Sequence, residues 1–193
     1  MNAHSPSKVL LALVLAISIA ATGCSSQWIN IALQDLPVLT QMALNIAGLV
    51  GTVSGKQANP SDLAVIQNIS AQAGRDLNLL QSLYAEYKAN PNAATLAKIQ
   101  SAIADINQNL PALLESAHVS NPLLTARVTA AVNLILATVN SFAALMPSPT
   151  GVKARTLVTP LPSASELKTQ WNLQVCAPAG TSDAPPFSRC MVR

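Results

Sequence analysis

A glutamate and a histidine three residues apart, Glu115 and His118, are the pair in this sequence best suited to bind a metal ion. On a helix this spacing places both side chains on one face, as in the di-iron centres of ferritin-like bundles. Such a centre needs a second copy of the pair and a glutamate from each of two further helices. The chain has one other histidine, His4, and Glu86 is the only glutamate that precedes the pair. The set is incomplete, so we predict no metal site and no cofactor, with Glu115 and His118 as the only candidate ligands.

The residues that other catalytic sites require do not occur in the necessary patterns. The sequence has no CxxCH motif for attaching haem and no GxxxxGK motif for binding phosphate. Residues 51–55 read GTVSG, which does not match the GxSxG of a hydrolase nucleophile. The eight acidic residues are scattered along the chain. We therefore predict that the protein is not an enzyme.

The N-terminal residues carry the features of an export signal. Residues 9–21 (VLLALVLAISIAA) form a run of 13 without a charge. This run is too short to cross a bilayer as a helix, which needs about 20 residues, but it fits the apolar part of a signal peptide. The small residues Ala21, Thr22 and Gly23 lead directly to Cys24. In this segment the chain resembles a bacterial lipoprotein precursor, in which small residues and a glycine precede the lipid-bearing cysteine.

The resemblance implies that residues 1–23 are removed as a signal peptide and that Cys24 receives a lipid. The mature protein would then be exported and anchored in a membrane, facing the periplasm or the cell exterior. Ser25, in place of an aspartate after the cysteine, favours the outer membrane in a host with two membranes. Because Ala21 stands where the lipoprotein pattern most often has leucine, cleavage by an ordinary signal peptidase and an uncleaved anchor stay open as alternatives.

Two further cysteines, Cys176 and Cys190, remain once Cys24 is assigned to the lipid. An even number of cysteines in an oxidising compartment favours a disulfide. Closing a loop of this size stabilises a fold by about 3 kcal/mol in the chain-entropy account. We therefore predict a disulfide between Cys176 and Cys190.

An Asn-Pro dipeptide recurs at residues 59–60, 90–91 and 121–122, at a constant interval of 31. Asparagine caps helix N-termini, proline is tolerated in the first turn, and the residue before a proline disfavours the helical conformation. Each dipeptide therefore predicts the end of one helix and the start of the next. Between the dipeptides, apolar residues recur every three or four positions, as on the buried face of a helix.

These signals predict an all-α fold, an antiparallel up-and-down four-helix bundle over residues 24–146. Short connections place consecutive helices side by side and antiparallel. We expect a kink at Pro111 inside the third helix, because proline lacks the N–H that the helical turn needs, and Pro37 could split the first helix. The predicted helices cover about 28–54, 61–89, 92–118 and 122–146.

Residues 147–193 form a proline-rich tail with seven of the 13 prolines of the chain. Within the tail, Ser163 and Glu166 match a capping box, which predicts a short helix over about 164–172. We expect this helix to pack on the bundle through Trp171, with the disulfide loop following it.

Two of the predicted helices are apolar on more than one side. Residues 36–55 and 128–146 carry no charge, and a helix that is apolar all round is either fully buried or in contact with a partner. The tail helix and the neighbouring helices could cover this surface. Otherwise it would contact another protein, a second copy of the chain or a membrane. The predicted interaction face consists of the residues outside the main apolar stripes: Val132, Leu136, Val139, Met42 and Leu49.

The composition narrows the function further. Charged residues make up 10% of the chain, against about 25% in a typical domain. A net charge of +3 gives no basic patch for nucleic acid. We expect a lipid-anchored, non-enzymatic scaffold or a protein- or lipid-interaction module of the cell envelope, with the membrane, a second copy or another envelope protein as partner. The alternative is a carrier that holds an apolar ligand, haem or a metal in a cavity of the bundle.

Overall fold

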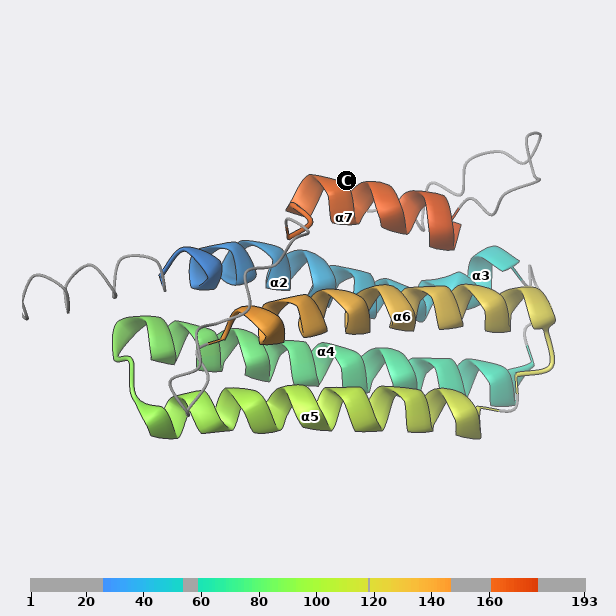
Figure 1. The fold of residues 1–193 in the computed structure, drawn as a ribbon. Helices are drawn as coiled ribbons and strands as arrows, with labels where there is room; N and C mark the ends of the chain where they lie inside the picture. The colour runs from blue at the N-terminus through green and yellow to red at the C-terminus, as the bar shows by residue number, and fades with distance from the viewer. Residues whose placement is uncertain (1–25, 54–58, 118, 147–160, 177–193) are drawn as a thin grey trace, which may run out of the picture.

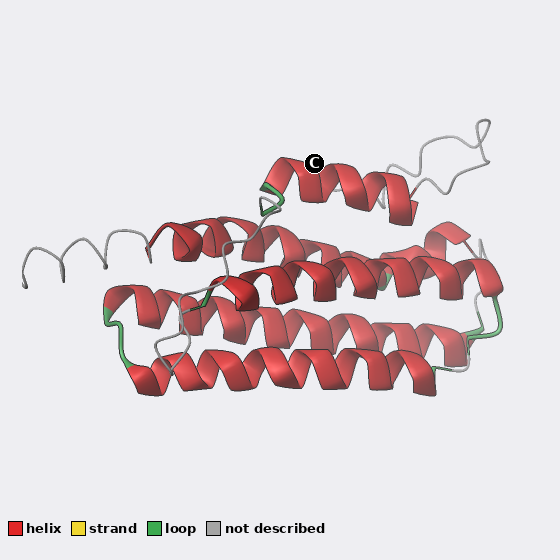
Figure 2. Ribbon diagram, in the orientation of Figure 1, coloured by secondary structure: helices red, strands yellow, loops and turns green. Residues whose placement is uncertain are grey.

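The computed structural model describes residues 26–53, 59–117, 119–146 and 161–176. Within these ranges the chain is helical and has no strand (Figure 2), so the predicted all-α class is confirmed. The described helices are α2 (Ser26–Ile46), α3 (Gly48–Val53), α4 (Pro60–Ala89), α5 (Ala93–Ser116), α6 (Pro122–Leu145) and α7 (Ala164–Trp171), and α7 continues directly into a π-helical turn, η1 (Asn172–Cys176).

The four long helices lie side by side (Figure 1). α2 contacts α4 and α6, and α5 contacts the same two helices. At a rise of about 1.5 Å per residue, α4 with its 30 residues extends over about 45 Å. On the side away from α5, α7 packs on α2 and η1 packs on α6. The C-terminal elements therefore cover the two helices that the sequence predicted to be apolar on more than one side.

The first predicted helix, 28–54, is divided next to Gly48 and not at Pro37. α2 passes through Pro37 without a break, and α3 begins at Gly48. Proline removes one backbone donor, but the neighbouring Leu36 and Leu39 are fully buried, so their packing holds the helical turn in place. A glycine in a helix costs about 1 kcal/mol relative to alanine, which favours the division beside Gly48. The described ranges therefore hold six α-helices instead of the five that were predicted.

α5 contains Pro111, the position of the predicted kink, and continues as one helix to Ser116. In the turn before the proline, Nδ2 of Asn107 donates to the carbonyl oxygen of Ile103 at 2.9 Å. The same amide exchanges two hydrogen bonds with Asn140 of α6, at 2.8 Å and 2.9 Å. This reciprocal pair attaches the turn before Pro111 to α6.

Two of the three Asn-Pro dipeptides begin helices as predicted. Asn59 caps α4, with its Oδ1 accepting from the N–H of Ser61 at 3.0 Å. Asn121 caps α6 and accepts from the N–H groups of Leu123 and Leu124 at 3.0 Å and 3.1 Å. In both helices proline follows the cap as the first helical residue, where its missing N–H would have had no partner.

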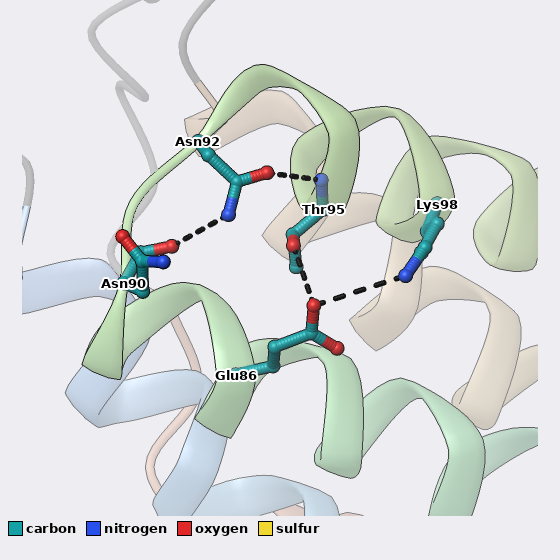
Figure 3. A network of polar contacts seen from close by, with 5 residues as sticks. All are labelled: Glu86, Asn90, Asn92, Thr95 and Lys98. Atoms are coloured by element: carbon teal, nitrogen blue, oxygen red, sulfur yellow. Dashed lines mark hydrogen bonds and ion pairs between the residues drawn. The ribbon is translucent and has the colours of Figure 1, made fainter.

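The middle dipeptide acts differently, and the prediction that it begins a helix is wrong. Asn90 ends α4, whereas Asn92 caps α5. Oδ1 of Asn92 accepts from the N–H of Thr95 at 2.8 Å, and its Nδ2 donates to the carbonyl oxygen of Asn90 at 2.8 Å (Figure 3). Asn92 is three residues before Thr95, the spacing that an N-cap side chain requires, whereas Asn90 is too far from that N–H.

Small residues bring α2 and α4 close together. Oγ of Ser70 in α4 donates to the carbonyl oxygen of Ala43 in α2 at 2.7 Å. One turn further along α4, a Cβ added to Gly74 would lie 3.3 Å from Cδ2 of Leu44. The backbones can therefore approach at this point because neither Ser70 nor Gly74 carries a bulky side chain.

Candidate functional site

Three of the predicted site residues, Cys24, His118 and Cys190, lie outside the described residues. The lipid on Cys24 therefore stays a prediction. Glu115, the other candidate metal ligand, is exposed on α5. Among the residues that the structure describes, no group of three or more His, Cys, Asp or Glu side chains is placed to hold a metal ion.

Cys176 is the predicted disulfide residue that the structure describes. It ends η1, is 1% exposed and is disulfide-bonded. Its partner cysteine lies outside the described residues, so the pairing with Cys190 stays a prediction. The bond joins the end of the segment that packs on α6 to another part of the chain.

The predicted interaction face is buried inside the molecule. Val132, Val139, Met42 and Leu49 are fully buried, and Leu136 is partly buried against the core. The expectation that these side chains face a partner is wrong for the folded chain, because other helices of the same chain cover them. α6 contacts α2, α3, α5 and η1, and α2 contacts α3, α4, α6 and α7.

α6 is the one helix, among those described, that is long and apolar enough to cross a membrane. Length and composition alone lead to this result, and the core helix of a globular protein meets the same criteria. Its contacts with four other elements account for its apolar surface without a bilayer.

The covering segment, α7 and η1, buries one apolar side. Leu167, Trp171 and Val175 follow one another at intervals of four and have no exposed surface. α7 starts with the predicted capping box, which is confirmed. Oγ of Ser163 accepts from the N–H of Glu166 at 3.3 Å, and the Glu166 carboxylate accepts from the N–H of Ser163 at 2.6 Å. The start of α7 is therefore fixed locally, and its attachment to the other helices comes from buried apolar side chains.

Where α7 begins, it lies against a buried carboxylate of α2, that of Asp35. The side chain is 2% exposed, and a backbone hydrogen bond from Ala164 reaches it. Oδ2 of Asp35 has no hydrogen-bond partner among the described residues. Burial raises the pKa of Asp35 from 3.8 to about 6; the Ala164 hydrogen bond opposes this rise and the charge of Glu166 adds to it. A buried and incompletely paired carboxylate at a helix contact marks Asp35 as the candidate functional residue.

Asp35 is not among the site residues predicted from the sequence, although the sequence holds a signal for it. Asp35 is the only charged residue between Cys24 and Lys56. Met42 follows it by seven residues, so both side chains lie on one face of α2. A lone acid on an otherwise apolar helix face was the observation that would have identified it.

A second group of buried polar atoms lies in an aromatic cluster formed by α2, α4 and α6. The ring of Tyr84 contacts Trp28 and Phe142 edge to face, with centroids 5.4 Å and 6.5 Å apart. The Tyr84 hydroxyl and Nε1 of Trp28 are buried and have no hydrogen-bond partner within the described ranges. Burial raises the pKa of Tyr84 above its ordinary value of 10.0, so its hydroxyl stays protonated and able to donate.

The corner between α4 and α5 carries a polar network at the surface (Figure 3). Oε1 of Glu86 accepts from Oγ1 of Thr95 at 2.7 Å and lies 3.8 Å from Nζ of Lys98. The side chains of Glu86 and Lys98 are 49% and 61% exposed, and an ion pair so hydrated contributes about 0–1 kcal/mol. The network fixes the corner, and its ordinary surface chemistry gives no indication of a binding site.

No protein-family model matches the chain, and neither a curated protein nor a solved structure matches it.

Proposed function

We propose that this protein is a lipid-anchored helical protein of the cell envelope that acts as a non-enzymatic scaffold or interaction module. The lipid on Cys24 holds the mature chain on a membrane, facing the periplasm or the cell exterior, and on the outer membrane where the host has two. Its protein partner is another envelope protein or a second copy of the chain.

The position of the first described helix sets how near to the membrane an anchored chain would lie. α2 begins at Ser26, two residues after Cys24. Two residues extend over about 7 Å at most, so a lipid on Cys24 would hold the helices close to the membrane surface. The end of the molecule that carries Trp28 would then face the lipid headgroups.

We further propose that α2, α4, α5 and α6 form an antiparallel, up-and-down four-helix bundle to which α3, α7 and η1 are added. The connections support this topology. Residues 90–92 join α4 to α5 and residues 117–121 join α5 to α6, and both of these helix pairs are in contact. Helices joined by so short a connection pack as antiparallel neighbours.

Mass spectrometry of the mature protein, purified from its native host, tests the anchor. We expect a chain that begins at Cys24 and carries acyl groups. The Cys24→Ser variant should lose its membrane association, whereas the Ser25→Ala variant, which keeps the cysteine, should stay with the membranes. A Cys24→Ser protein that stays membrane-bound in high salt would overturn the anchor and place apolar helices in the bilayer.

Native mass spectrometry of the chain without residues 1–23 tests self-association. The described surface keeps four large apolar side chains about half exposed or more, on four different elements: Leu44, Leu79, Leu123 and Leu173. We expect dimers or larger assemblies that bind an apolar dye less strongly than the separated chains. A monomer that binds no dye would contradict the self-associating form of the proposal.

A second candidate function is a carrier whose ligand lies inside the bundle. The Tyr84 hydroxyl and Nε1 of Trp28 favour it, because two buried donors without a partner in the described structure suit a ligand with a polar end. Native mass spectrometry, absorbance and metal analysis of protein from the native host test this function. A colourless sample with the mass of the processed chain alone would argue against a bound lipid, haem or metal.

A further inference from the structure

The attachment of α7 to α2 combines apolar burial with the burial of a carboxylate. Leu167 and Trp171 have no exposed surface, and removing this apolar area from water favours the docked position. The first residue of α7, Ala164, lies at the carboxylate of Asp35, whose Oδ2 is unpaired as far as the described residues show. Apolar burial therefore favours the docked position and burial of the ionised Asp35 opposes it, while the Ala164 hydrogen bond offsets part of that cost.

Two carboxyl groups act on each other at this contact. Among the described side chains of α2, α4, α6 and α7, the charge that acts on Asp35 is that of Glu166. The backbone N–H and the hydroxyl of Ser163 donate to the Glu166 carboxylate at 2.6 Å and 2.8 Å and hold its pKa below the ordinary value. Glu166 therefore stays ionised around neutral pH, and Asp35 is the group of the pair that changes charge.

We propose that α7 can detach from α2, and that protonation of Asp35 strengthens its attachment. Protonation removes the buried charge and ends the repulsion from Glu166. Ionisation has the opposite effect, because the Asp35 carboxylate gains hydration when α7 leaves. The docked state binds the proton more tightly than the released state, so acid strengthens the attachment and base weakens it. Release exposes the face of α2 that carries Asp35.

The range of the effect follows from the two pKa values. Docked Asp35 titrates at about 6, and an exposed aspartate titrates at 3.8. Attachment is strongest below the lower value, weakens as the pH rises between the two, and changes little above the higher one. From about pH 5 to about pH 7.5, the equilibrium constant for release should rise about tenfold.

Hydrogen exchange of the mature protein, followed by mass spectrometry, measures this release directly. The exchange of peptides from α7 measures the detachment of α7, and the exchange of peptides from α4 measures the opening of the remaining helices. Each exchange rate is divided by the intrinsic rate of the same peptide at that pH. The test variant is Asp35→Asn, which keeps the shape of the side chain without its titration. The matched control is Asp105→Asn, an exposed aspartate of α5 on the side of the molecule away from α7.

We expect the protection of the α7 peptides to fall about tenfold between about pH 5 and about pH 7.5 in the unchanged protein and in the Asp105→Asn variant. The Asp35→Asn variant should lose this dependence, and α4 should keep its protection throughout. Unchanged α7 protection across the pH range in the natural protein would overturn the proposal, whether or not Asp35→Asn folds. The same pH dependence in Asp35→Asn, or a parallel loss of protection in α4, would overturn it as well.

Discussion

At the scale of single residues, Tyr84 and Asp35 show how this core tolerates polar groups. Both are at least 98% buried, and each has a side-chain oxygen without a partner in the described structure. Burying a polar group without a hydrogen bond costs about 1–3 kcal/mol in proteins. The aromatic contacts of Tyr84 with Trp28 and Phe142 offset that loss through apolar burial and edge-to-face packing.

Replacing Tyr84 by phenylalanine should therefore raise the free energy of unfolding by about 1 kcal/mol or leave it unchanged. The substitution keeps the ring in contact with Trp28 and Phe142 and removes only the buried hydroxyl. Urea denaturation measures the change. Tyr87→Phe, at a partly exposed position of the same helix, is the control and should have no effect. A loss of more than about 1 kcal/mol in Tyr84→Phe would mean that the hydroxyl has a bound partner, such as water or a ligand.

At the scale of elements, side chains just outside the helices decide where each helix begins. Asn59, Asn121 and Ser163 cap α4, α6 and α7 with hydrogen bonds to backbone groups two or three residues ahead. At the α4–α5 corner, Asn92 has this role, and Asn90 contributes its backbone carbonyl. Asn90 therefore ends α4 and Asn92 begins α5, although the two residues lie in one short polar stretch.

Exchanging Asn92 for alanine should lower the free energy of unfolding by about 1 kcal/mol, because the N–H of Thr95 loses its acceptor. Asn90→Ala keeps the backbone carbonyl that Asn92 uses and should cost less than half as much. Thermal and urea denaturation of the two variants give the comparison. An equal loss in both variants, or a larger loss in Asn90→Ala, would mean that Asn90 is the effective cap.

Local signals in the sequence predicted the elements well where the structure depends on neighbouring residues. The capping box at Ser163 and the caps at Asn59 and Asn121 need only residues two or three positions away. Pro37 did not divide α2, because the buried leucines beside it stabilise the turn through contacts with other helices. Apolar periodicity shows that a helix is buried on several sides, but it does not identify the covering element.

The candidate site was harder to predict for the same reason. The sequence shows Asp35 as a lone acid on α2, but its burial and its neighbours Ala164 and Glu166 depend on α7, more than 120 residues further along the chain. The predicted face at Val132 and Met42 is buried by elements whose pairing no single helix encodes. The spacing of residues within one helix predicted its apolar faces, whereas it did not predict which distant helices cover those faces.

At the scale of the whole molecule, the sequence is poor in charged residues. The chain has 11 Lys and Arg and 8 Asp and Glu in 193 residues. Glu86 and Lys98 form an ion pair, 3.8 Å apart and well exposed. Stability therefore comes mainly from apolar burial and from backbone and amide hydrogen bonds, including the reciprocal pair of Asn107 and Asn140.

The free energy of unfolding should accordingly change by less than about 0.5 kcal/mol when NaCl is raised from about 50 mM to about 500 mM at neutral pH. Salt screens exposed charges, and few of them act across short distances here. Urea titrations at the two salt concentrations measure the effect, and Lys98→Ala should give the same small difference. A decrease of more than about 1 kcal/mol in high salt would show that ion pairs other than Glu86 with Lys98 stabilise the fold.

The covering segment, α7 and η1, is synthesised after the helices on which it packs. α7 and η1 are the last described elements in the sequence, yet they lie on α6 and on α2, which is synthesised much earlier. Until residues 161–176 have been synthesised, the apolar surface that they bury on α2 and α6 stays exposed to solvent and to chaperones. A chain truncated before residue 161 should therefore aggregate or be degraded more readily than the full-length chain.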